Sequence, residues 1–143
     1  MKDGECAEYR VSFPNLDCSY VYETGKLDHS YNCIAWAVGL TNQWVEPGDL
    51  NNLAEYLGNR GYVAVAAGAA DADIDAPGKS AHYITHVYKR YTDERVPGMP
   101  VELWESKMSE GIRMTHNRRG LTNGTGHSNY GDIVGSFKKA PTK

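Results

Sequence analysis

The chain has only three cysteines among its 143 residues and no CxxC motif. So small an odd number argues against a disulfide scaffold, and the missing motif removes a common zinc or redox signature. No segment approaches the ~20 apolar residues of a membrane span. The N-terminus lacks the apolar core of a signal peptide. We therefore expect free thiols, a reducing compartment and a cytoplasmic protein, with export by a specialised machine as the alternative route.

A strong excess of either charge is also missing, since the formal net charge is −3. This balance gives no electrostatic reason to expect a nucleic acid or an anionic membrane as partner. Hydrophobic residues make up 41% of the chain and charged residues 23%, which is ordinary for a globular protein. With no internal repeat, residues 1–143 are predicted to form one domain. The oligomeric state is left open.

Two segments have the pattern of helices. Residues 32–39 begin with Asn32, a good N-cap, and end with Gly39, a good residue for leaving a helix. The second helix begins at 47–49. Its apolar residues follow the i, i+3, i+4, i+7 spacing and are Leu50, Leu53, Ala54 and Leu57.

The remaining segments alternate between strands and turns. After a strand at 62–68, residues 69–80 look like a flexible acidic loop. β-branched and aromatic residues then predict strands at 81–91, 101–108, 111–116 and 130–137, and short strands are expected at 10–14 and 19–23. Helices followed by antiparallel strands indicate an α+β fold, with the N-terminal helices packed on the sheet.

Cys33 would occupy the first position of the helix that Asn32 caps. Unpaired backbone N–H groups and the helix dipole favour an anion there, which would lower the pKa of the thiol. The Cys33 N–H, with the Asn32 side-chain amide, could also stabilise an oxyanion. Cysteine is, however, among the residues most often buried and inert, so a nucleophile needs a partner base.

Histidine supplies the candidate bases. His82 and His86 lie on one predicted strand, about 13 Å apart at ~3.3 Å per residue, so they are poorly placed to share a metal ion. A cysteine that opens a helix and a histidine on a later strand can form a nucleophile–base pair, which makes His86 the predicted general base. His116 is a more remote base. A metal site of Cys33, His116 and His127 is a distant alternative, and no metal is predicted.

A third residue should orient the His86 ring. If residues 81–91 and 101–108 form a symmetric hairpin centred near Val96, His86 lies opposite Ser106. A one-residue bulge would place Glu105 there instead. Glu105 has the better charge for an imidazolium partner, but a surface acid is its ordinary interpretation.

Further residues are candidates for contacting substrate. Trp36 would line a cleft, Lys107 could bind a substrate carboxylate, and His116 completes this set. The Gly-rich segment 118–131 lacks the context of a phosphate-binding loop and is predicted to be a mobile loop beside the cleft. It would bring His127 near the substrate.

Several motifs occur in a familiar order: FPNL at 13–16, YNCIAWAVG at 31–39, TH at 85–86 and W-x-S-K at 104–107. The sequence resembles an uncharacterised family of small bacterial proteins with this pattern, similar in layout to papain-like cysteine peptidases and amidases. The resemblance implies a papain-like α+β domain with Cys33 as nucleophile and His86 as base. It favours Ser106 and Lys107 over Glu105 as residues of the pattern.

The expected function is a cysteine-dependent amidohydrolase, that is, a peptidase, amidase or deamidase, and a toxin or effector is one role for it. Its substrate would be a peptide or protein amide, and no cofactor is expected. The alternative is a binding or immunity-type module that keeps the fold without turnover.

Overall fold

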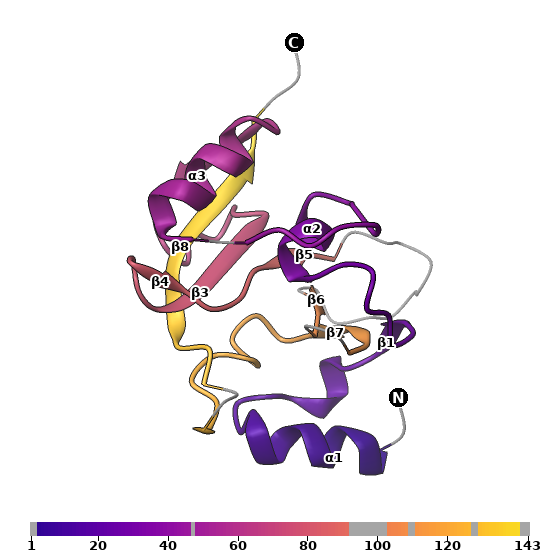
Figure 1. Cartoon of the computed structure of the whole chain (residues 1–143). Coiled ribbons are helices and arrows are strands. Elements are labelled where there is room, and N and C mark those ends of the chain that lie inside the picture. The colour runs from indigo at the N-terminus through magenta and orange to yellow at the C-terminus, as the bar shows by residue number, and fades with distance from the viewer. Residues whose placement is uncertain (1–2, 47, 92–102, 109–110, 127–128, 141–143) are drawn as a thin grey trace.

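The computed structural model describes every residue except 1–2, 47, 92–102, 109–110, 127–128 and 141–143 (Figure 1). Its helices are α1 (Asp3–Ser12), α2 (Cys33–Ala37) and α3 (Leu50–Gly58), with a 3-10 turn, η1 (Cys18–Tyr20). The strands are β1 (Glu23–Gly25), β2 (Tyr62–Val65), β3 (Ile74–Ser80), β4 (Tyr83–Ile84), β5 (Tyr88–Arg90), β6 (Trp104–Lys107), β7 (Arg113–His116) and β8 (Asp132–Lys139). None of the described helices is long and apolar enough to cross a membrane.

The strands form one sheet in the order β1-β7-β6-β5-β3-β8-β2, and β4 pairs with β3. All of the pairs between described strands are antiparallel. The expected α+β class with an antiparallel sheet is therefore confirmed. The late strands β5, β6 and β7 are neighbours, and this order joins the segments that carry His86, Ser106 and His116.

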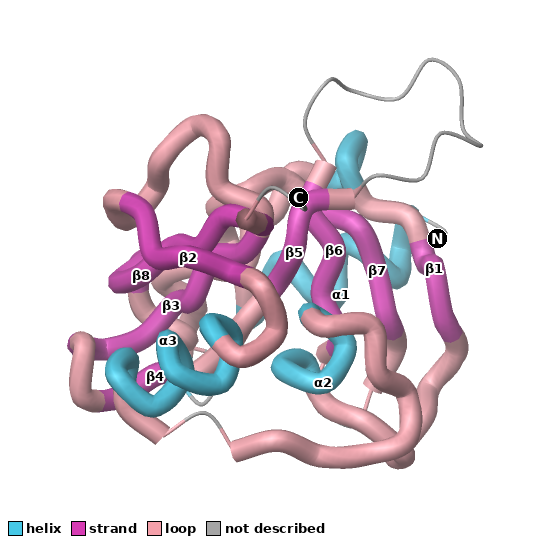
Figure 2. Tube along the Cα trace, turned by 90° about the horizontal axis from the view of Figure 1, so that it is seen from above, coloured by secondary structure: helices cyan, strands magenta, loops and turns pink. Residues whose placement is uncertain are grey.

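Helices α2 and α3 pack against the same apolar surface (Figure 2). The apolar spacing of α3 turns Leu53 and Leu57 inward, and both are buried against Ile74 and Phe137 of the sheet. Asp49 caps this helix by accepting a hydrogen bond from the Asn52 N–H at 2.8 Å. The second helix, predicted to begin at 47–49, is confirmed and begins at Leu50, directly after its cap. Its apolar spacing matches the surface that it covers.

Helix α1 covers a second apolar cluster, below β6 and β7 in Figure 1. Phe13 and Leu16 pack there with Met114 of β7. Residues 10–14, expected to be a strand, contain the last turn of α1 instead.

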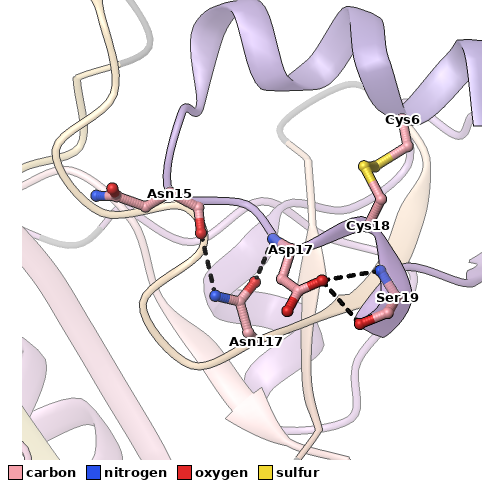
Figure 3. Close-up of a disulfide and its surroundings, with 6 residues drawn as sticks. All are labelled: Cys6, Asn15, Asp17, Cys18, Ser19 and Asn117. Carbon is pink, nitrogen blue, oxygen red and sulfur yellow. Dashed lines mark hydrogen bonds between the residues drawn. A yellow bond between two sulfur atoms is a disulfide. The ribbon is translucent and has the colours of Figure 1, made fainter.

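A disulfide joins Cys6 of α1 to Cys18 of η1, with the Cα atoms 5.9 Å apart (Figure 3). The expectation of three free thiols is therefore wrong, and Cys33 is the free cysteine. Two cysteines separated by 12 positions become neighbours because the chain reverses between α1 and η1. This reversal is tertiary information that a count of cysteines does not contain.

The expected acidic loop at 69–80 is wrong for its second half, which forms β3 near the middle of the sheet. Its Asp75 is fully buried and would normally disfavour a strand. Arg118 pairs with both oxygens of this carboxylate, at 2.7 and 2.8 Å, and the Ser136 hydroxyl donates to it at 2.7 Å. Partners from distant segments thus allow an acidic residue inside the sheet.

The expected strand at 81–91 is divided into β4 and β5, so His82 and His86 do not share a strand. His82 lies in the turn between β3 and β4, and His86 lies just before β5. The two histidines consequently belong to different environments.

Candidate functional site

Cys33 is the first residue of α2, as predicted. The Asn32 side chain caps the helix by accepting a hydrogen bond from the Ala35 N–H at 3.2 Å. The same side chain braces a neighbouring segment, since it accepts from the Val45 N–H at 3.2 Å and donates to the Val45 carbonyl at 2.8 Å. Asn32 therefore holds the segment at Val45 as well as capping the helix, and one of the two N–H groups of its amide, the expected oxyanion donor, is already bound to the Val45 carbonyl.

The environment of the Cys33 thiol does not favour a thiolate. Burial raises its pKa to about 11, although backbone hydrogen bonds at Val87 and Ile34 and the charge of Lys107 act in the opposite direction. Helix α2 has only five residues, so its dipole is small. The expected lowering of the thiol pKa is thus not found, because loss of hydration outweighs the helix terminus.

His86 belongs to a buried chain of hydrogen bonds. Its Nε2 lies 3.0 Å from the Ser106 hydroxyl, which lies 2.7 Å from Nε2 of His116. The His116 Nδ1 lies 2.7 Å from the Asn117 carbonyl. His86 is 2% exposed, and Ser106 and His116 are fully buried. All three side chains are hydrogen-bonded, as buried polar groups need to be in a protein interior.

Both histidines of this chain are neutral at pH 7. Burial, and then the charge of His116, lowers the pKa of His86 to about 3. Burial lowers the pKa of His116 to about 4, although the Asn117 carbonyl and Asp75 oppose it. The site can therefore take up a proton only at a high free-energy cost unless a partner stabilises the charge.

Tyr130 connects the histidine chain with the cysteine. Its ring stacks on His86, with the centroids 4.5 Å apart and the planes 17° apart. Burial, and then the charge of Cys33, raises the pKa of Tyr130 to about 12. The Thr85 hydroxyl donates to the Tyr130 carbonyl and fixes this segment. Cys33 and His86 thus share Tyr130 as a neighbour, and among the described residues no hydrogen bond joins the thiol to the His86 ring.

The backbone beside Tyr130 allows only glycine. Gly131 has a φ of +82°, and a Cβ atom there would lie 2.1 Å from the Gly78 carbonyl oxygen of β3. The chain entering β8 consequently comes very close to the backbone of β3, the strand with which β8 pairs. This close approach fixes the backbone next to Tyr130, whose ring stacks on His86.

Ser106, rather than Glu105, contacts His86, although the hairpin register differs from the symmetric one. Lys89 of β5 pairs with Glu105 of β6, so the observed register differs by two residues from the symmetric hairpin. Val96, the expected centre of that hairpin, lies outside the described residues. Glu105 forms an ion pair with Arg113 at 3.4 Å. Because side chains alternate along a strand, Glu105 and Ser106 lie on opposite faces of the sheet. The assignment of Glu105 as an orienting residue is therefore wrong.

Trp36 and Lys107 lie in a layer of cations and aromatic rings beneath α2. The indole of Trp36 contacts the Lys89 ammonium at 4.0 Å and the Arg113 guanidinium at 3.9 Å. Lys107 is fully buried, with its ammonium 4.8 Å from the ring centroid of Tyr31. Buried contacts of this kind support α2 on the sheet, and His116, as shown above, belongs to the histidine chain.

Sequence reasoning missed the ion pair of Asp75 and Arg118 beside the histidine chain. Arg118 also lies over the indole of Trp104, and the Tyr88 ring contacts His116 edge-on at 5.1 Å. The alternation of apolar residues around Asp75 was the available signal. Segment 118–131 was expected to be a mobile loop, but its first part is anchored by Arg118 and by the buried Leu121 and Thr122. His127 lies outside the described residues.

A pocket of about 670 Å³ opens beside Tyr130. Polar residues dominate its wall, which includes Glu46, Lys79, His82, Thr85 and Tyr130. Thr85 and Tyr130 are shared with the surroundings of His86, so this pocket adjoins the histidine chain. Within the described ranges, no group of three or more His, Cys, Asp or Glu side chains could hold a metal ion.

Together the fold and this buried polar site define a small α+β domain with an antiparallel sheet. The chain belongs to the family described as a domain of unknown function, DUF7689, which matches residues 22–138. This membership agrees with the expected uncharacterised family. No curated protein and no solved structure compared with the chain matches it.

Proposed function

We propose that the protein is a cysteine-dependent amidohydrolase acting on a peptide or protein amide, with the site laid out as in papain-like cysteine peptidases. The observation that carries the proposal is the shared environment of Cys33 and His86. Backbone hydrogen bonding at Val87, the residue after His86, lowers the pKa of the thiol. Tyr130 stacks on His86, and the charge of Cys33 raises the pKa of the same Tyr130. A nucleophile and its base must come within hydrogen-bond reach of each other, and these shared neighbours support such an approach.

In the proposed reaction, Cys33 Sγ attacks the amide carbonyl while His86 takes the thiol proton. His86 returns this proton to the leaving amine as the C–N bond breaks, and water then hydrolyses the thioester. The N–H groups of Cys33 and Ile34, in the first turn of α2, are the oxyanion donors of this scheme. Because the resting thiol and imidazole are both neutral, proton transfer accompanies the attack.

The pocket beside Tyr130 is the proposed substrate site. Its wall carries Lys79, His82 and Glu46, so it suits a polar substrate with both charged and hydrogen-bonding groups better than an apolar chain. This pocket replaces Trp36, Lys107 and His116 as the proposed substrate contacts, since those residues are committed to other contacts.

A set of electrophilic peptide and amide probes tests the proposal, with the labelled residue identified by mass spectrometry. We expect labelling at Cys33 that is lost in Cys33→Ala and reduced at least about tenfold in His86→Ala, because nucleophile and base act together. His29→Ala, which changes an exposed histidine, is the matched control and should label normally. Equal labelling of the wild type and His86→Ala would contradict the assigned base.

A binding or immunity-type module without turnover is the second candidate, and the raised pKa of the partly buried Cys33 thiol favours it. Iodoacetamide labelling distinguishes the two. A catalytic site should give mechanism-based labelling at pH 7 despite slow general alkylation. A binding module should resist both reagents until the pH approaches 11 or the protein unfolds.

A further inference from the structure

We propose that Ser106 and His116, anchored on the Asn117 carbonyl, fix the tautomer of His86 so that its Nδ1 is the proton-accepting atom. The catalytic consequence of this assignment rests on the proposed function, but the tautomer itself does not. Ser106 and His116 are then positioning residues, which act on the reaction through His86.

The Asn117 carbonyl, at the end of the chain away from His86, determines which atom donates in each hydrogen bond of the chain. A backbone carbonyl can only accept, so the His116 Nδ1, 2.7 Å from the Asn117 oxygen, carries a proton. Asn117 is itself held, because its side chain donates to the Asn15 carbonyl at 3.1 Å and accepts from the Asp17 N–H at 2.9 Å (Figure 3). The anchor is therefore a fixed part of the fold.

The remaining protons follow from that anchor. Neutral His116 has a bare Nε2, which accepts the Ser106 hydroxyl proton across 2.7 Å. A hydroxyl has a single proton to donate. The Ser106 oxygen must therefore accept the hydrogen bond from His86, whose Nε2 lies 3.0 Å away and carries the proton. A neutral imidazole has one N–H, so His86 Nδ1 has a free lone pair.

The opposite direction would require a charge in the interior. If Ser106 donated to His86, the His116 Nε2 would have to donate to Ser106 while Nδ1 still donates to the Asn117 carbonyl. His116 would then be an imidazolium, although it is fully buried and its pKa is lowered to about 4. The nearest acid described, Asp75, is already engaged by Arg118 and Ser136.

Packing keeps both rings in the orientation that this chain needs. Tyr130 stacks on His86 at 4.5 Å, and the edge-on Tyr88 ring contacts His116 at 5.1 Å. A flipped His86 ring would lose its hydrogen bond to Ser106 inside a buried site. The hydrogen-bond chain and the aromatic contacts thus select one orientation and one tautomer.

Side-chain ¹⁵N NMR of the full-length protein at pH 7 tests the proposal directly, since protonated and bare ring nitrogens have distinct shifts. We expect protonated Nε2 and bare Nδ1 for His86, and the reverse for His116. His86 protonated at Nδ1 in the wild type would overturn the proposal, and this measurement needs no variant.

Three variants test the role of the chain. Ser106→Ala and His116→Leu remove the anchor and should give mixed tautomers of His86. His116→Gln should keep the wild-type tautomer, because its amide oxygen can accept from Ser106 while its NH₂ group donates to Asn117. An unchanged His86 tautomer in both Ser106→Ala and His116→Leu, folded by circular dichroism, would refute the assignment to these residues.

Kinetics separates this proposal from the proposed function. With a substrate, kcat should fall at least about tenfold in Ser106→Ala and His116→Leu, with KM unchanged, and His116→Gln should restore it. If the NMR result is as expected and Cys33→Ala has no effect on any labelling or turnover, the tautomer assignment stands and the hydrolase proposal fails. A Gln variant as inactive as the Leu variant would refute the positioning role.

Discussion

Acid should destabilise this protein well above the pH at which most carboxylates titrate. His86 and His116 have folded-state pKa values of about 3 and about 4, against about 6.5 in an unfolded chain. Between these limits the unfolded state binds more protons, so the free energy of unfolding falls as the pH falls. The stabilisation from keeping both rings neutral is complete above the unfolded pKa and is lost progressively below it.

The size of the effect follows from the same pKa values. From pH 7 to pH 5, one histidine that stays neutral when folded and titrates near 6.5 when unfolded costs about 1.8 kcal/mol. The two rings together cost about 3.5 kcal/mol, which is a large part of the stability of an ordinary domain. His116 begins to take up a proton in the folded state near pH 5, which lowers this total slightly, so it is an approximate upper value.

Urea unfolding at pH 7, 6 and 5 measures the effect. We expect the free energy of unfolding to fall by roughly 3 kcal/mol over this range in the wild type and by about half as much in His116→Gln. His29→Gln, which changes an exposed histidine, should keep the wild-type dependence. A wild-type stability that is constant from pH 7 to pH 5 would show that the two rings are hydrated, and the argument from burial would be refuted.

Three further predictions concern stability. Replacing both Cys6 and Cys18 by Ser should lower the free energy of unfolding by about 3 kcal/mol, because the disulfide closes a loop between cysteines 12 positions apart. In urea titrations, reduction of the wild-type disulfide should lower the free energy of unfolding by the same amount. Leu57→Ala should cost about 2–5 kcal/mol, whereas Leu27→Ala, at a residue 62% exposed, should cost under about 0.5 kcal/mol by the same assay. Asp75→Asn should cost about 3–5 kcal/mol because it leaves the Arg118 guanidinium with a neutral partner, while Asp71→Asn, in the exposed pair with Lys138, should change the melting temperature little. Equal losses for Asp75→Asn and Asp71→Asn would contradict the inferred burial of the first pair.

Local signals predicted the helices that begin at Cys33 and Leu50. In both, the N-cap and the apolar spacing lie within a few residues of each other, so the sequence pattern contains the information that the helix needs. Helix α1 lacks a comparable apolar face, and its last residues, 10–12, fall within the strand predicted at 10–14. Its position depends on the cluster around Phe13 and on the disulfide to η1.

The sequence predicted Ser106 as the partner of His86 correctly, but from a strand register that the structure does not have. A symmetric hairpin suggested the pair, whereas the sheet pairs Lys89 with Glu105 and lets His86 reach Ser106 from just before β5. His116 joins them because β7 pairs with β6 in a register that sets it opposite Trp104. The chain of His86, Ser106 and His116 depends on the registers of two strand pairs, β5 with β6 and β6 with β7. Residue spacing alone encodes neither register.

The sequence by itself determined the α+β class, the capped start of the helix at Cys33 and the inward face of the helix at Leu50. These properties depend on short-range periodicity and capping, which residues close in the chain decide. Only the tertiary structure decided that Cys6 pairs with Cys18, that Asp75 can occupy a central strand beside Arg118, and that the partly buried Cys33 thiol is neutral. Each of these depends on groups far apart in the chain that exclude water together, and dehydration of a charge or a thiol is a property of the packed fold.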